Sequence, residues 1–292
     1  MGVRREGMLE IHAAVLLFGL AGLFGKLISA PSPVIVFGRT LFATIGLAVV
    51  VFLFKIRFKP NSTADLWRMI FLGVLLAFHW VAFFLSIQIS TVAVGLLTFA
   101  AFPVFVTFME PYYFNETLRK MDILTAVLVF AGLWFIVPSF DFGNRTTQGA
   151  FWGVLSGLSF AFLSILNRKQ VASYPPIMIA VYQNAAAAIV LFPFLFCFRF
   201  QLSPNDYLLL SILGLACTAL SHVLFIRSLK FIKTQLAGVI AGLEPVYGSI
   251  FAAVLLGEIP SERTIIGGIL IVGSIMLATR LRFPEERLSR KS

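Results

Sequence analysis

Long apolar runs separated by short polar or proline-containing breaks extend from residue 9 to residue 280. A helix needs ~20 apolar residues to cross a hydrocarbon core of ~30 Å, because lipid offers no partner for unpaired backbone groups. Ten segments meet this requirement and are predicted to be transmembrane helices. They cover residues 9–28, 33–54, 66–90, 92–114 and 121–138, and then 148–167, 175–198, 205–228, 233–256 and 264–280.

The basic residues are distributed unevenly between the two sides of this arrangement. If the N-terminus is cytoplasmic, 18 of the 23 Lys and Arg residues fall on the cytoplasmic side and three, Arg145, Arg199 and Arg263, on the other. The remaining two, Lys26 and Arg39, lie within spans. Because cytoplasmic loops carry the excess of Lys and Arg, both termini are predicted to be cytoplasmic.

The two halves of the chain resemble each other at an offset of 142 residues. This offset pairs Phe83 with Phe225, Ser86 with Ser228, Pro103-Val104 with Pro245-Val246, and Glu116 with Glu258. Each half holds five predicted spans, an odd number, so the second half must enter the membrane with the opposite orientation. The sequence therefore predicts an all-α integral membrane fold of two inverted five-helix repeats, with substrate near the midplane between them.

Composition agrees with one membrane unit. Apolar residues make up 59% of the chain and charged residues 12%, against about 25% charged residues in soluble domains. The expected organisation is a first repeat at 9–138, a second at 148–280 and a basic cytoplasmic tail at 281–292. The net charge of +10 lies mostly in loops, so it indicates orientation in a lipid bilayer and no nucleic-acid partner. Runs of small residues such as Gly149, Gly153 and Gly157 favour close helix packing and leave the oligomeric state open.

Several motifs resemble the drug/metabolite transporter superfamily, in particular its ten-helix members with two EamA-type repeats. The resemblance rests on Phe37-Gly38-Arg39, on Pro103 with Glu116, and on Leu243-Glu244-Pro245 continuing to Leu256-Gly257-Glu258-Ile259-Pro260. It implies a secondary carrier in the inner membrane, often an exporter of amino acids or related metabolites. In two places the chain departs from the family pattern: Phe18-Gly19 stands where Trp-Gly is common, and Phe102 occupies the position that Glu244 holds in the second repeat.

Ionisable groups inside a membrane are costly and need a partner, a cavity or a route to the surface. The candidates are Lys26, Arg39, His79, Glu110, His222 and Glu244. Arg39, with Lys26, is expected to bind an anionic group such as a carboxylate, although either side chain could instead extend to the interface. Glu244 either pairs with one of these two cations, or is protonated through desolvation and carries protons.

Further candidates for the substrate site are His79 with its neighbour Trp80, and the mid-span triplet Tyr182-Gln183-Asn184, of which at least one member should face the interior. A histidine among apolar residues can also be a packing residue. Pro103 and Pro245 each remove a helical hydrogen bond and are predicted to be gating or hinge positions.

No catalytic motif, phosphate-binding loop or metal-ligand cluster is present in the sequence. We therefore predict no enzyme activity, no cofactor and no metal, and a secondary transporter of small metabolites that works by alternating access, driven by protons or by exchange. The alternative is an integral-membrane transferase acting on lipid intermediates, for which Glu116, Arg119, Lys120 and Asp122 form the one charged loop cluster.

Overall fold

A computed structural model describes residues 2–56, 59–114, 118, 120–137, 139 and 141–289, with side chains described in these ranges except at 2–5, 235 and 278–289. Within this part, every regular element is a helix. Glu116 and Arg119 lie outside the described residues, as do the side chains of the predicted basic tail at 281–292.

The helices follow the predicted spans closely. The first half contains α1 (Gly2–Leu27), α2 (Ser32–Leu53), α3 (Thr63–Ile89), α4 (Val92–Phe99), α5 (Phe102–Phe114) and α6 (Lys120–Ile136). The second contains α7 (Arg145–Gln170), α8 (Pro176–Leu191), η1 (Phe192–Phe196), α9 (Pro204–Gly214), η2 (Leu215–Leu220), α10 (Ser221–Ser228), α11 (Thr234–Ala241), α12 (Glu244–Leu256) and α13 (Glu262–Ser289).

Local sequence explains where these helices start and stop. Ser62 and Asn144 accept hydrogen bonds from backbone N–H groups of the first turns of α3 and α7, and Ser203 forms a capping box with Asp206 at α9. Such caps satisfy N–H groups that have no partner within the helix. Gly257 ends α12 with a φ of 67°, a left-handed conformation that favours glycine.

Eight segments of the described residues are long and apolar enough to cross a membrane: Glu6–Leu27, Ser32–Leu53, Thr63–Ile89, Val92–Phe114, Arg145–Gln170, Pro176–Phe196, Pro204–Ser228 and Leu236–Leu256. They correspond to eight of the ten predicted spans. The other two form α6, which has 17 residues, and α13, whose side chains are described as far as Leu277. The chain is thus a multi-pass membrane protein.

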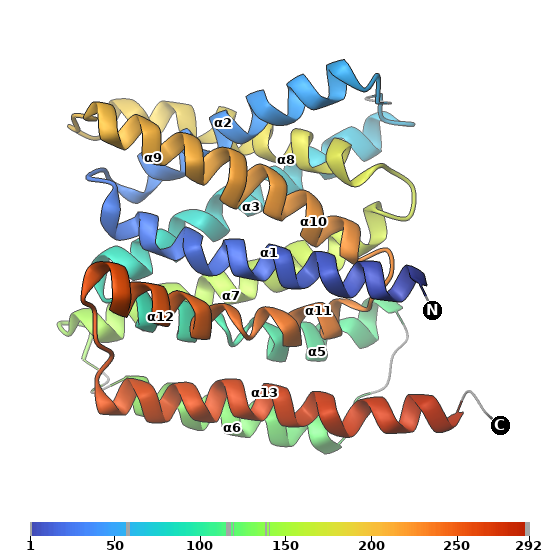
Figure 1. Ribbon diagram of the computed structural model, residues 1–292, viewed down its shortest axis with the longest axis vertical. Coiled ribbons are helices and arrows are strands. Elements are labelled where there is room, and N and C mark those ends of the chain that lie inside the picture. The colour runs from blue at the N-terminus through green and yellow to red at the C-terminus, as the bar shows by residue number, and fades with distance from the viewer. Residues whose placement is uncertain are drawn as a thin grey trace.

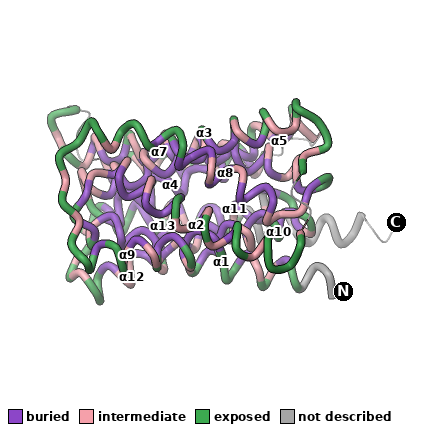
Figure 2. The backbone as a smooth tube through the Cα atoms, turned by 90° about the horizontal axis from the view of Figure 1, so that it is seen from above, coloured by how far each residue is buried: buried purple, intermediate pink, exposed green. Residues whose placement is uncertain are grey.

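The helices lie side by side in one bundle (Figure 1). α2 and α9 lie along one side, α1 is central, and α6 packs against α13 on the far side. Buried residues gather in the middle of the bundle and exposed ones form its rim (Figure 2). The first helix begins and the last helix ends at the same end of the bundle, which we call the terminal end.

The 142-residue offset recurs in the helix boundaries. α4, α5 and α6 begin at residues 92, 102 and 120, and α11, α12 and α13 begin at 234, 244 and 262. α4 and α5 end at residues 99 and 114, and α11 and α12 end at 241 and 256. The packing recurs as well, since α7 lies against α3 as α1 lies against α10.

Candidate functional site

A cavity lies inside the bundle where the two halves meet. Its lining consists of Phe18, Ala21, Arg39, Leu76, His79, Trp80, Phe83, Phe99, Phe160, His222 and Glu244. The space left free between these side chains, including the part that opens outward, is about 430 Å³. Helices α1 to α4 supply eight of these residues, and α7, α10 and α12 supply one each. Both repeats therefore build the same site.

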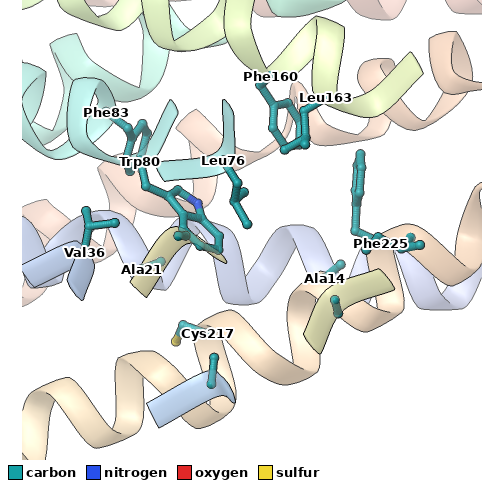
Figure 3. Packing of buried hydrophobic residues seen from close by; sticks show 14 of the residues in the cluster. Ala14, Ala21, Val36, Leu76, Trp80, Phe83, Phe160, Leu163, Cys217 and Phe225 are labelled. Atoms are coloured by element: carbon teal, nitrogen blue, oxygen red, sulfur yellow. The ribbon is translucent and has the colours of Figure 1, made fainter. Parts of the chain in front are cut away.

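Aromatic rings form most of the cavity wall. Phe160 of α7 lies 4.8 Å from the His79 ring and 5.4 Å from Phe99, measured between ring centroids. Figure 3 shows Trp80 and Leu76 extending from α3 toward Ala21 of α1, with Phe160 close to Phe225. Such walls suit flat or apolar portions of a small molecule, and the face of an indole ring also attracts cations.

Arg39 is the largest fully buried side chain in the described core, with 1% of its surface exposed. Its Nε donates a hydrogen bond of 2.9 Å to Thr218 Oγ1, and its guanidinium carbon lies 3.9 Å from the centre of the Trp80 ring. A carboxylate partner is absent from the described contacts of Arg39. The side chain does not extend to the surface as the interfacial alternative requires, and it holds a positive charge against the cavity.

The partner of Arg39 lies on a widened turn. η2 is a π-helix over Leu215–Leu220, and Thr218 Oγ1 donates to the carbonyl oxygen of Leu213 at 2.6 Å, five residues back. This hydroxyl therefore uses its hydrogen within its own helix and presents its lone pairs to Arg39. Single π-turns of this kind are frequent at functional sites.

The two histidines of the cavity are fixed in opposite tautomers by their neighbours. Nδ1 of His79 lies 3.1 Å from the carbonyl oxygen of Ser156, which can only accept, so in the neutral ring Nδ1 carries the hydrogen and Nε2 is an acceptor. Nδ1 of His222 lies 3.3 Å from Nδ2 of Asn184, an amide nitrogen that can only donate. His222 therefore accepts at Nδ1 and carries its hydrogen at Nε2.

Glu244 is 4% exposed and its carboxylate has no hydrogen-bond or ion-pair partner among the described residues. The predicted pair with Lys26 does not form. Lys26 is in the last turn of α1, where its Nζ donates a hydrogen bond of 2.8 Å to the Ser90 carbonyl oxygen and lies 3.8 Å from Glu258 Oε1. The predicted pair with Arg39 is absent as well, although both side chains line the cavity. Lys26 does not line it.

The mid-span triplet is largely internal, as predicted, but it lies behind the cavity wall. Gln183 and Asn184 have no exposed surface, and Tyr182 is half-buried. Gln183 Nε2 donates 2.6 Å to Asn167 Oδ1 of α7, and Asn184 bonds to His222. Asn184 thus contacts a cavity residue without lining the cavity itself.

Both proposed hinge prolines lie at helix breaks. Pro103 follows the interruption between α4 and α5, and Pro245 follows that between α11 and α12. Glu244, which begins α12, owes its place in the cavity to this break. Its counterpart Phe102, which begins α5, instead stacks on Phe99 at a centroid distance of 5.2 Å.

Seven of the residues that line the cavity were not predicted as site residues from the sequence: Phe18, Ala21, Leu76, Phe83, Phe99, Phe160 and His222. The repeat contains a signal for part of them, because the 142-residue offset pairs Phe18 with Phe160. A partly buried ion pair lies outside the cavity, where Arg168 Nη1 contacts Glu110 Oε1 at 2.9 Å and joins α5 to α7. Groups of three or more potential metal ligands do not occur among the described residues.

A bundle of apolar helices around a cavity that carries buried charges is typical of a membrane transporter. Comparison with known proteins agrees: the model of the EamA-like transporter family matches twice, at residues 5–137 and 147–280. The chain belongs to this family, whose members are transporters and not enzymes, so the transferase alternative is set aside.

Several relatives align over most of the chain. The uncharacterized transporter YxxF of Bacillus subtilis is 25% identical and covers 94% of this chain and 89% of its own. The inner membrane transporter YicL of Salmonella typhimurium is 25% identical, with 95% and 96% covered. An S-adenosylmethionine uptake transporter of Rickettsia bellii is 24% identical over 68% of each chain. One crystal structure covers 96% of this chain and 98% of its own with a TM-score of 0.71 and 17% identity, a likeness of fold alone.

Proposed function

We propose that this protein is a secondary transporter that moves small organic metabolites, amino acids or related compounds, out of the cell by alternating access. The observation that carries the proposal is the cavity between the two repeats, where Arg39 and Glu244 hold opposite charges that do not pair with each other. A zwitterionic substrate satisfies both, with its carboxylate on the guanidinium fork and its ammonium on the carboxylate. The proposed direction is export, whereas the relative from Rickettsia bellii is named as an uptake transporter.

The proposed architecture is ten membrane helices in two inverted halves. The recurrence of helix boundaries at 142 residues supports it, as does the pairing of α6 with α13 and of α2 with α8 across the bundle. α6 and α13 also expose large apolar side chains, among them Phe130, Trp134 and Ile269 at 56%, 63% and 67%. Such surfaces suit lipid contact.

Counterflow in proteoliposomes tests the function. Vesicles preloaded with one unlabelled compound are given the same compound labelled, over a panel of the 20 amino acids and S-adenosylmethionine. We expect Arg39→Lys to reduce exchange at least 10-fold, because an ammonium cannot bind a carboxylate and Thr218 with the fork geometry of a guanidinium. Arg68→Lys, on the surface at the start of α3, is the matched control. Exchange of no panel compound by the wild-type protein contradicts the proposal.

The orientation has its own test. A phosphatase that is active only in the periplasm, fused after Ser292, should be inactive, and a cytoplasmic reporter at the same position should be active, because 18 basic residues favour the cytoplasmic side. Active phosphatase at this position contradicts a cytoplasmic C-terminus. If the N-terminus is cytoplasmic, it also contradicts an even number of spans.

A further inference from the structure

Six side chains between the cavity and the terminal end each carry a polar atom that has no hydrogen-bond partner among the described residues. The atoms are Ser164 Oγ, Asn167 Nδ2 and Gln170 Oε1 on α7, Gln183 Oε1 and Asn184 Oδ1 on α8, and His222 Nε2 on α10. The serine, both asparagines and Gln183 have no exposed surface, and His222 is 3% exposed. Unpaired polar atoms at this depth oppose folding, and native proteins usually satisfy them with water or a ligand.

These residues form a stripe across α7, α8 and α10, in which hydrogen bonds join two pairs of them. Ser164, Asn167 and Gln170 recur every three residues, so each is a neighbour of the next on the surface of α7. Asn167 is bonded to Gln183, whose neighbour Asn184 is bonded to His222 in the cavity wall. We call these six residues the polar path.

The outer end of the polar path lies at the terminal end of the bundle. Gln170 is the last residue of α7 and is partly exposed. Just beyond it, Tyr174 Oη accepts a hydrogen bond of 2.9 Å from the backbone nitrogen of Asn61, in the connection from α2 to α3. That connection lies at the end where α1 begins (Figure 1). The path therefore leads from the cavity to one aqueous face.

The corresponding stripe in the first repeat is apolar. Residues 142 positions before the polar path are Gly22, Gly25, Ile28, Leu41, Phe42 and Trp80. None of these side chains can hold a chain of water except at the indole nitrogen. The polar stripe is therefore a feature of the second repeat and not of the shared scaffold.

We propose that the polar path holds hydrogen-bonded water and conducts protons between the aqueous phase at the terminal end and Glu244 in the cavity. The inference rests on the proposed transport function and adds its coupling ion. Of the elements around Glu244, α2, α3 and α10 contribute the charged or titratable Arg39, His79 and His222. The parts of α1 and α4 that face the cavity are apolar, and the polar path meets the cavity at His222.

The test uses Asn167→Leu and Gln183→Leu in proteoliposomes. Two quantities are compared: counterflow at equal pH, and accumulation driven by a pH gradient, both with the panel compound that gives the largest counterflow. Removing water from the path should leave counterflow within twofold of wild type and lower gradient-driven accumulation at least 10-fold. Gln88→Leu, which removes an amide whose Nε2 already donates to the Ala30 carbonyl oxygen, should change neither. Asn167→Ser, which keeps a polar group, should restore most of the driven accumulation.

The outcomes separate this inference from the transport function. Driven accumulation that stays at the wild-type level in both leucine variants overturns the path, and so does a wild-type protein that exchanges a compound but does not respond to a pH gradient of either sign. Equal loss of counterflow and accumulation also overturns it, since the residues then act in substrate binding or folding. The second measurement is proton entry into dye-loaded vesicles that are given the mixed panel. Entry with the wild-type protein should exceed entry with either leucine variant, and equal entry rejects the path.

Discussion

The bond from Arg39 to Thr218 fixes the one buried cation of the described cavity, and Thr218→Val is the perturbation that isolates it. Valine has the shape of threonine but accepts no hydrogen bond, so Arg39 Nε loses its partner at 2.9 Å. A hydrogen bond to a charged group contributes roughly 1.5–3 kcal/mol, and a buried donor left unsatisfied costs a similar amount. We therefore expect Thr218→Val to lower the free energy of unfolding by about 2–4 kcal/mol, allowing for the lost bond to Leu213.

The matched control is Thr44→Val. Thr44 Oγ1 donates to the carbonyl oxygen of Thr40 at 2.7 Å, as Thr218 does to that of Leu213, but no arginine among the described side chains donates to it. Its replacement should cost less than about 1 kcal/mol. Unfolding in mixed micelles of dodecyl maltoside and dodecyl sulfate measures all variants. In the Arg39→Lys background, the difference in unfolding free energy between Thr218→Val and Thr44→Val should fall by at least half. A double-mutant cycle of this kind reports the coupling energy between Arg39 and Thr218. Equal costs for Thr218→Val and Thr44→Val in the wild-type background refute the reasoning.

Two further predictions concern the ends of the bundle and the outer helix pair. Lys26 donates to the Ser90 carbonyl oxygen, and Glu258 accepts from a backbone nitrogen at 2.9 Å. Because exchanged side chains cannot make these backbone bonds, the double variant Lys26→Glu with Glu258→Lys should have a melting temperature no higher than that of either single variant. Recovery of the wild-type melting temperature would show a simple ion pair. A Cβ on Gly267 would lie 2.5 Å from the Gly132 carbonyl oxygen, whereas one on Gly273 would meet no atom of the described residues within 4 Å. Gly267→Ala should therefore lower stability by about 1–3 kcal/mol and Gly273→Ala should not; equal stabilities contradict the close approach of α6 and α13.

The apolar pattern predicted the helices well because each span must satisfy its backbone internally, which leaves little choice of conformation in lipid. The proline positions also identified the breaks in the fourth and ninth predicted spans. Both inferences depend on local chemistry alone. The six-residue π-turn at Leu215–Leu220 had no such local signal, and it widens the helix just before His222. His222 was therefore not predicted to line the substrate site.

The pairing of charges was less predictable, because it depends on which side chains reach each other in space. Lys26 and Glu244 both lie within predicted spans, but Lys26 contacts Glu258 at the end of the bundle instead. Glu110 similarly contacts Arg168, a residue that the sequence placed in a loop. The partners of the ionisable residues within the spans could therefore not be assigned from the sequence, since each buried charge can also be satisfied from the ends of neighbouring helices.

The two repeats differ at positions that the proposed mechanism uses. A carrier with identical halves would present the same chemistry to both faces of the membrane. Here the common scaffold is kept, as the recurring boundaries of α4 to α6 and α11 to α13 indicate. The differences fall on Glu244 against Phe102 and on the polar path against its apolar counterpart. In the proposed mechanism Glu244 exchanges protons with one aqueous face through the polar path, so the two faces of the carrier differ in their access to this carboxylate.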